Sequence, residues 1–152
     1  MRKLIIPVFL FFTGFRLLSQ SANPLYDSTL AKSLGADDYG MKPYILVVLK
    51  TGPNKINDQT KLDILFEGHL KNIQKLANEG KLIVAGPFTK NEKSYRGIFI
   101  LNIKSKDEAK ALLMDDPTIK EKVLEPEFLE WYGSAALGEY LKVHQKIEKK
   151  SF

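Results

Sequence analysis

The chain has 152 residues, which suits one domain, and its 44% hydrophobic and 27% charged residues are an ordinary globular balance. It contains no cysteine, which excludes disulfides, thiol nucleophiles and thiolate metal sites. The formal net charge is +5, but residues 1–20 hold three basic residues and no acidic one, so the remainder carries only +2. A charge this small does not favour nucleic-acid binding.

Residues 1–20 have the pattern of a secretory signal peptide. Two basic residues precede an apolar run from Leu4 to Phe15, and small or polar residues follow. The run is shorter than the about 20 apolar residues that a membrane-spanning helix needs. This predicts cleavage, export to the periplasm or the exterior, and no stable membrane insertion afterwards. Two alternatives stay open, an uncleaved anchor or a start at Met41, because Arg16 lies unusually close to the expected cleavage site.

Residues 21–41 mix small, polar and acidic side chains without a sustained period, which predicts a linker or a loosely attached arm. A short docked helix that uses Tyr26, Leu30 and Leu34 is the alternative. From residue 42 the hydrophobic pattern becomes regular, so residues 42–133 are expected to form the folded domain.

Within that domain, four apolar runs predict strands and two amphipathic stretches predict helices. The strands are expected at residues 44–49, 82–85, 97–103 and 128–132. The helices are expected at about residues 59–79, and from a capping box at Ser105 through Leu113, with Pro117 limiting the end. The order β-α-β-β-α-β predicts an α+β, ferredoxin-like fold with one antiparallel sheet and both helices on one face.

The last predicted strand carries apolar or aromatic side chains on both faces. Leu129 and Trp131 alternate with Phe128 and Tyr132. A sheet that is apolar on both faces needs a second cover, which predicts a homodimer. Residues 134–152 are expected to form a helical tail that either braces the dimer or extends into solvent.

The chain has only two histidines, and one of them, His69, falls on the apolar stripe of the first predicted helix. Asp116 continues the apolar stripe of the second predicted helix at its inner end. Because both helices lie on one face, the two side chains are able to meet, and a carboxylate on one ring nitrogen leaves the other as an acid or base. The simpler interpretations are a packed core histidine and an Asp-Pro pair that ends a helix.

Several short motifs, in this order and spacing, resemble the YciI-like (YCII-related) family. They are Gly68-His69-Leu70, Ala85-Gly86-Pro87-Phe88, Gly97 at the start of the third strand, and Asp115-Asp116-Pro117. The resemblance covers about residues 43–132 and implies a dimeric α/β barrel with a His-Asp pair at the active site, here His69 and Asp116. Members are usually cytoplasmic and little larger than this core. The leader, linker, tail and acidic segment 124–127 therefore depart from the family pattern.

The resemblance leaves the reaction open, because the family also resembles muconolactone isomerase, some members are dehydrochlorinases of chlorinated hydroxyquinols, and most have no established substrate. The leading expectation is a cofactor-free enzyme that moves a proton on a small organic substrate, as a lyase, isomerase or hydrolase. One alternative is a non-catalytic module of the cell envelope that binds or senses a small molecule. Another is haem binding, since related dimeric α/β-barrel proteins hold haem through a histidine.

Gly86, Pro87, Phe88 and Arg96 are the candidate substrate-binding residues. Gly86-Pro87 is typical first of a turn that lets Phe88 cover the sheet, and only second of a pocket wall. Arg96 would bind an anionic substrate, although an exposed arginine beside a hairpin is commonly only solvated. No phosphate-binding glycine loop, HExxH zinc motif or nucleophile elbow occurs, so no metal and no cofactor are expected.

Overall fold

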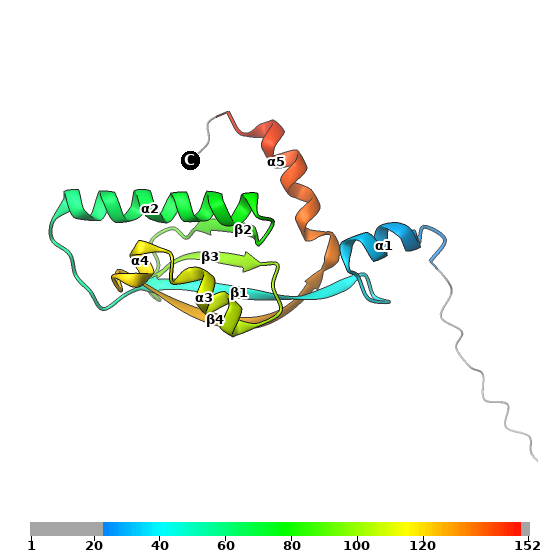
Figure 1. Ribbon diagram of the computed structural model, residues 1–152, viewed down its shortest axis with the longest axis horizontal. Coiled ribbons are helices and arrows are strands. Elements are labelled where there is room, and N and C mark those ends of the chain that lie inside the picture. The colour runs from blue at the N-terminus through cyan, green and yellow to red at the C-terminus, as the bar shows by residue number, and fades with distance from the viewer. Residues whose placement is uncertain (1–22, 150–152) are drawn as a thin grey trace, which may run out of the picture.

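The computed structural model describes residues 23–149, so the signal peptide expected over residues 1–20 lies outside the described residues. One sheet of four antiparallel strands, in the order β2-β3-β1-β4, forms the centre of the domain (Figure 1). The strands are β1 (Met41–Thr51), β2 (Leu82–Pro87), β3 (Tyr95–Leu101) and β4 (Leu124–Ser134). This confirms the predicted α+β class and agrees with a ferredoxin-like arrangement.

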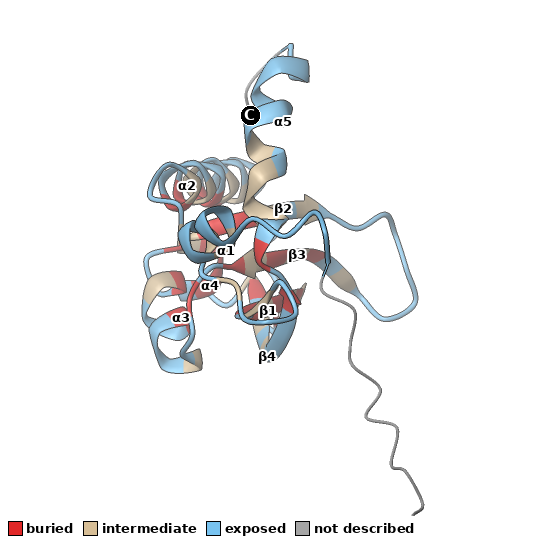
Figure 2. Ribbon diagram, turned by 90° about the vertical axis from the view of Figure 1, so that its right-hand side faces the viewer, coloured by how far each residue is buried: buried red, intermediate tan, exposed pale blue. Residues whose placement is uncertain are grey.

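Three helices cover one face of the sheet: α2 (Gln59–Asn78), α3 (Lys106–Leu113) and α4 (Pro117–Lys120). Figure 2, seen from one end, shows them on the same side of the strands. Side chains alternate along a strand, so Ile45, Val47 and Leu49 of β1 all point toward the helices and are buried. They pack with Phe99 and Leu101 of β3 into a single core between the sheet and the helices.

Short polar side chains determine where the two longer helices begin. Asp58 caps α2 by accepting a hydrogen bond from the amide of Lys61. Ser105 caps α3 by accepting from the amides of Asp107 and Glu108. The capping box predicted at Ser105 is therefore the start of α3.

β4 is longer than predicted. It begins at Leu124 rather than Phe128 and pairs along its whole length with β1. Pro126 has no amide hydrogen, but it is tolerated because β4 is an edge strand. The acidic segment that was expected to precede the strand is part of it, and Glu127 forms an ion pair with Lys50 of β1 at 2.5 Å.

The segments on both sides of the predicted domain are helical. Part of the stretch predicted as a linker forms α1 (Ser28–Leu34), which Asp27 caps and which ends at Gly35 with φ +70°, a conformation that favours glycine. After β4, the 3-10 helix η1 (Ala135–Tyr140) leads into α5 (Leu141–Ile147), so residues 135–147 are helical as predicted. Figure 1 shows α1 and α5 at the end of the sheet opposite the loop between β1 and α2.

Hydrogen bonds attach both terminal segments to the sheet. Lys42 Nζ, on β1, donates to the carbonyl of Leu34 at the end of α1, at 3.1 Å. The hydroxyl of Tyr140, at the end of η1, donates to the carbonyl of Ile83 on β2, at 2.6 Å. Within residues 23–149, no helix is both long enough and apolar enough to span a membrane.

Candidate active site

His69 lies near the middle of α2, on the face that the helix turns toward the sheet. The buried residues of α2 recur at spacings of three and four and form one stripe: Leu65, His69, Asn72 and Leu76. Only 8% of His69 is exposed. Its ring is stacked on the ring of Phe99, with 5.9 Å between the ring centroids. The ring of Phe66 meets it edge-on, with 6.0 Å between the centroids. The imidazole is therefore held between apolar side chains.

Asp116 lies opposite His69 and is fully buried, but it is not on the helix where the sequence pattern placed it. α3 ends at Leu113, and Asp116 is the N-cap of α4, with Pro117 at the first helical position. The prediction that Asp116 continues the stripe of the second helix is therefore wrong, because the proline starts a new helix. The side chain still points inward, and its Oδ2 lies 2.6 Å from Nδ1 of His69.

Thr118, which was not predicted from the sequence, completes this cluster. Its side chain is fully buried, and its hydroxyl donates to Oδ1 of Asp116 at 2.6 Å. Its backbone amide donates to the same oxygen at 2.9 Å, and the hydroxyl oxygen lies 3.4 Å from Nδ1 of His69. The Asp-Pro-Thr run is a recognisable helix start and would have predicted the amide contact. Nothing in the sequence indicates that the hydroxyl reaches the same carboxylate.

These contacts keep the carboxylate of Asp116 ionised. Burial by itself raises the pKa of this carboxyl, but the hydrogen bonds from His69 and Thr118 together outweigh burial and lower the pKa below its usual 3.8. An ionised carboxylate only accepts hydrogen bonds, so Nδ1 of His69 must carry the hydrogen between them. When the ring is neutral, Nε2 is then the unprotonated nitrogen, and it is able to accept a proton.

Close packing between α2 and α4 brings the pair within reach. A Cβ on Gly68, the neighbour of His69, would lie only 2.5 Å from Cγ of Pro117. Because glycine has no side chain, α4 approaches α2 closely enough for Asp116 to reach the ring. Gly68 and Pro117 thus allow the two helices to pack closely, whereas His69 and Asp116 supply the polar groups.

His69 lines a pocket of about 270 Å³ between α2 and the sheet. Its Nε2 makes no hydrogen bond with the described residues, and none of their buried side-chain nitrogens or oxygens lacks a partner. We therefore infer that Nε2 is accessible from this pocket. Apart from His69 and Arg96, the lining residues are all apolar or glycine. They are Leu49, Phe66, Leu70, Ile73, Ala85, Gly86, Pro87, Gly97, Phe99 and Leu124.

The pocket gathers three of the four residues predicted to bind substrate. Gly86, Pro87 and Arg96 line it together with His69. Phe88 does not line it; this side chain is 44% exposed, and its ring lies 6.2 Å from that of Tyr95. Gly86 and Pro87 were predicted to form a turn, but they are the last two residues of β2 and pair with Ile98 and Gly97 of β3. The end of this strand therefore lines the pocket with His69, and the aromatic side chain that follows it packs elsewhere.

Arg96 lines the pocket, but its position on β3 is on the face of the strand opposite to the helices. It precedes Gly97, whose strand position faces the helices together with that of Phe99. Because side chains alternate along a strand, the side chain of Arg96 starts from the opposite face. Arg96 therefore lines the pocket although its side chain starts from the face of β3 opposite to the helices.

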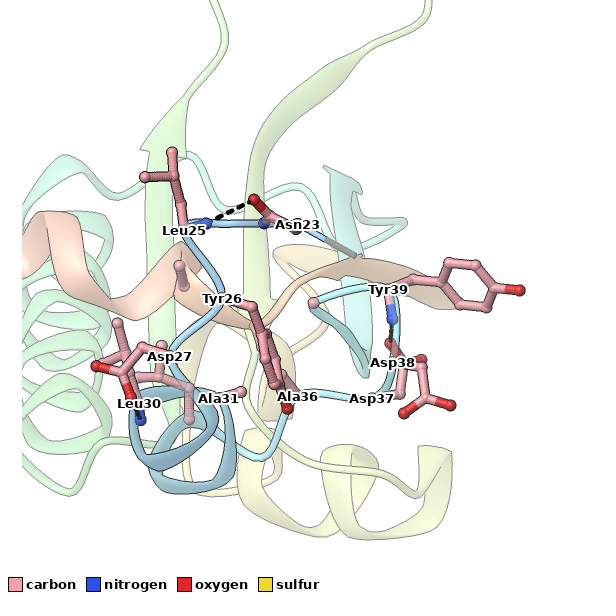
Figure 3. A pocket seen from close by; sticks show the side chains of 14 residues that line it. Asn23, Leu25, Tyr26, Asp27, Leu30, Ala31, Ala36, Asp37, Asp38 and Tyr39 are labelled. Atoms are coloured by element: carbon pink, nitrogen blue, oxygen red, sulfur yellow. Dashed lines mark hydrogen bonds between the residues drawn. The ribbon is translucent and has the colours of Figure 1, made fainter. Parts of the chain in front are cut away.

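A larger hollow of about 350 Å³ lies at the other end of the sheet, beside α1 (Figure 3). Its lining residues include three aspartates but no histidine, and two of the aspartates already have structural roles. Asp27 caps α1, and Asp37 accepts hydrogen bonds from the amide of Tyr39 and from the hydroxyl of Tyr132. The side chain of Tyr39 points out of the hollow. We therefore assign the candidate active site to the pocket between α2 and the sheet.

Potential metal ligands are not gathered elsewhere in the part of the chain that the structure describes. Between residues 23 and 149, no group of three or more histidine, aspartate or glutamate side chains is placed to hold a metal ion.

Comparisons with known proteins identify one family in the central part of the chain. A family model described as the YCII-related domain matches residues 44–131, which include most of the sheet and helices α2 to α4 but not α1, η1 or α5. One similar solved structure is 5-chloro-2-hydroxyhydroquinone dehydrochlorinase (TftG) from Burkholderia phenoliruptrix AC1100, in complex with 2,5-dihydroxybenzoquinone. The identity is 22% and the TM-score 0.44, over 58% of this chain and 92% of that chain. No curated protein matches the sequence.

Proposed function

Because the chain belongs to the YCII-related domain family, we propose that it is a cofactor-free enzyme that moves a proton on a small organic molecule, as a lyase, isomerase or hydrolase. The observation that carries this proposal is the 2.6 Å contact between Nδ1 of His69 and Oδ2 of Asp116, with Nε2 open to a pocket. His69 is the catalytic residue, and Asp116 is a positioning residue that acts through it.

The proposed reaction uses Nε2 first as a base and then as an acid. Nε2 accepts a proton from a carbon or a hydroxyl group of the bound molecule, which makes His69 an imidazolium. The ionised Asp116 lies against the other side of the ring and offsets this positive charge. The proton then returns to another atom of the same molecule or to the group that leaves. Few polar groups surround the pair, so the attraction is screened less than it would be in water.

Proton transfer is measurable without knowledge of the natural substrate. In D2O, the protein is expected to exchange the α-hydrogens of small α-hydroxyketones, such as hydroxyacetone, and proton NMR follows the loss of signal. His69→Ala should slow this exchange by about 10²- to 10⁴-fold, the usual contribution of a general base. The matched control is His144→Ala, since His144 lies on α5 and outside the pocket. Equal rates for the wild type and His69→Ala would exclude the proposed role.

The same experiment separates catalysis from binding alone. A protein of the cell envelope that binds or senses a small molecule would use the same pocket without turnover. In that case NMR would show a bound compound that is recovered unaltered and unexchanged, and His69→Ala would change only its dissociation constant. This outcome would replace the enzymatic proposal.

We further propose a homodimer joined through the face of the sheet that carries no helices (Figure 2). Leu129 and Trp131 of β4 are 42% and 36% exposed, and they pair with Leu46 and Tyr44 of β1 on that face. Leu129→Glu is expected to give a monomer in sedimentation velocity. The control is Leu25→Glu, because Leu25 is 89% exposed but lies beside α1. A dimer that survives Leu129→Glu would place the interface elsewhere.

Export remains a proposal that rests on the pattern of residues 1–20. The expected mature protein begins near Ser21 and is found in the periplasm or outside the cell. Mass spectrometry of the intact protein from fractionated cells tests this directly. A protein that keeps residues 1–20 and stays with the membrane fraction would support an uncleaved anchor instead.

A further inference from the structure

We infer that the pocket beside His69 takes a small, uncharged and largely apolar molecule with one hydroxyl group, which donates a hydrogen bond to Nε2. The inference rests on the proposed function in one respect, because both use the same nitrogen. It concerns which compounds the site admits, whereas the proposed function concerns the reaction.

The size and walls of the pocket restrict the ligand. The volume of about 270 Å³ lies just below the usual range of roughly 300–1,000 Å³ for ligand pockets. Side chains such as Leu49, Ile73 and Phe99 supply apolar surface and no hydrogen-bonding groups. A sugar or another compound with several hydroxyls would therefore bury polar groups without partners. Each such group weakens binding by about tenfold or more.

The charges around the pocket disfavour an anion. A carboxylate or phosphate in the pocket would lose its hydration and would lie near the ionised Asp116, which already holds His69. The nearest cation among the lining residues is Arg96, whose side chain starts from the opposite face of β3. No cationic side chain is therefore directed to the pocket from the face that bears the helices, and an uncharged ligand fits best.

The hydrogen on Nδ1 determines which polar group the ligand needs. Because Nδ1 of His69 donates to Asp116, Nε2 of the neutral ring has a lone pair and no hydrogen. The complementary group on the ligand must be a donor. A hydroxyl meets this requirement, whereas a ketone, ester or ether oxygen only accepts. The site is thus expected to distinguish an alcohol from the ketone of the same size.

Four six-membered-ring compounds test these three steps by ligand-detected NMR titration: cyclohexanol, cyclohexanone, cyclohexanecarboxylate and myo-inositol. Cyclohexanol should bind the wild type at least about tenfold more tightly than each of the others. The comparison with cyclohexanone tests whether the ligand needs a hydrogen-bond donor. The comparison with cyclohexanecarboxylate tests whether a negative charge weakens binding, and that with myo-inositol tests whether additional hydroxyl groups do. Equal or tighter binding of any one of them would overturn the inference.

Two alanines that line different hollows locate the bound cyclohexanol. Ala85 lies on the strand face toward the pocket, so Ala85→Leu should weaken binding by about tenfold or more. Ala136 lines the hollow beside α1, and Ala136→Leu should leave binding unchanged. If Ala85→Leu unfolds, Leu70→Trp fills the pocket from its rim, where Leu70 is 41% exposed. Loss of binding with Ala136→Leu alone would place the ligand in the wrong hollow and overturn the inference.

The ligand class and the reaction fail in different ways. If cyclohexanol binds as expected but no hydroxyketone exchanges its hydrogens, the proposed function fails and the ligand class stands. If exchange requires His69 but a carboxylate binds most tightly, the ligand class fails and the proposed function stands.

Discussion

Two aspartates at opposite ends of the sheet, Asp116 and Asp37, hold neighbouring groups in the same way. Each accepts a hydrogen bond from the backbone amide two residues later. Each accepts another from an aromatic side chain, which is the ring nitrogen of His69 at Asp116 and the hydroxyl of Tyr132 at Asp37. Asp116 is fully buried, whereas Asp37 is exposed and Tyr132 is 51% exposed. One hydrogen-bond pattern thus occurs in a candidate catalytic pair and in the attachment of a terminal segment.

Burial makes the difference between these two carboxylates. The pKa of Asp37 is lowered chiefly by the hydrogen bond from Tyr132, and water can replace that partner if it is lost. At Asp116 burial raises the pKa and the hydrogen bonds from His69 and Thr118 lower it by more, so the ionised form depends on these hydrogen bonds. Changes near Asp116 should therefore affect the whole fold, and changes near Asp37 should stay local.

The largest expected effect comes from removing the buried carboxylate. Asp116→Ala leaves the hydroxyl and amide of Thr118 and Nδ1 of His69 without their acceptor. The free energy of unfolding, measured by urea denaturation, is expected to fall by about 3–5 kcal/mol, as for other broken buried pairs. Asp37→Ala should cause a smaller loss, because its partners are exposed to water. Equal losses for both variants would contradict the role given to burial.

Asp116→Asn separates the cap from the charge. Asparagine is as good an N-cap as aspartate, so α4 should keep its start. The loss of stability is therefore expected to be smaller than for Asp116→Ala, while the exchange activity falls as much. Activity that is retained with asparagine would show that the charge next to His69 is unnecessary.

The next effect concerns Thr118. Thr118→Val keeps the shape of the side chain but removes the hydrogen bond that its hydroxyl donates to the carboxylate at 2.6 Å. A hydrogen bond to a charged group contributes about 1.5–3 kcal/mol, and a loss of this size is expected in urea denaturation. Thr118→Ser keeps the hydroxyl and should lose less. A valine variant as stable as the serine variant would mean that the hydroxyl contributes no stability.

Low pH provides a second measurement on the same carboxylate. Because the pKa of Asp116 is lowered in the folded protein, the carboxylate contributes stability at pH values above 3.8, its unfolded value. This contribution is lost as the pH falls through the lowered folded pKa. Thr118→Val removes one cause of the lowering, so its loss of stability at low pH should be smaller than that of the wild type and should be complete at a higher pH. Asp116→Asn should lack this part of the pH dependence.

A smaller loss is expected from crowding the contact between α2 and α4. Gly68→Ala adds a methyl group that must displace Pro117, because its Cβ would lie 2.5 Å from Cγ of the proline. Overpacking of this kind costs about 1–3 kcal/mol and should also lengthen the contact between His69 and Asp116. Gly86→Ala is the matched control, since a Cβ there meets nothing within 4 Å. Equal stability of the two variants would show that α4 can move away from α2 without a loss in the free energy of unfolding.

Features that repeat along the chain could be predicted from the sequence, whereas features that depend on a helix break or on a tertiary contact could not. The periodic stripe of α2 identified His69 as inward-facing, because burial repeats with the helical turn. Asp116 was correctly expected to point inward but was assigned to the wrong helix. The break between α3 and α4 depends on a cap and a proline, which local pattern resolves poorly. Thr118 was missed because its role depends on a tertiary contact. The linker was the first expectation for residues 21–41 because α1 buries none of its residues, and the short docked helix given as the alternative is the one that forms.

The smallest effect is expected at the exposed aspartate, and it is spectroscopic. The hydrogen bond to Asp37 raises the pKa of Tyr132 to about 12, because the charged carboxylate stabilises the protonated phenol. Asp37→Asn removes this charge, so the pKa of Tyr132 should move back toward 10.0, which ultraviolet titration of the tyrosinate measures. Exchange of hydroxyketones should stay at the wild-type rate, because the Asp37 contact lies at the other end of the sheet from His69. A fall in that rate would show that the terminal attachment and the pocket are coupled, and the two ends could then no longer be treated as independent.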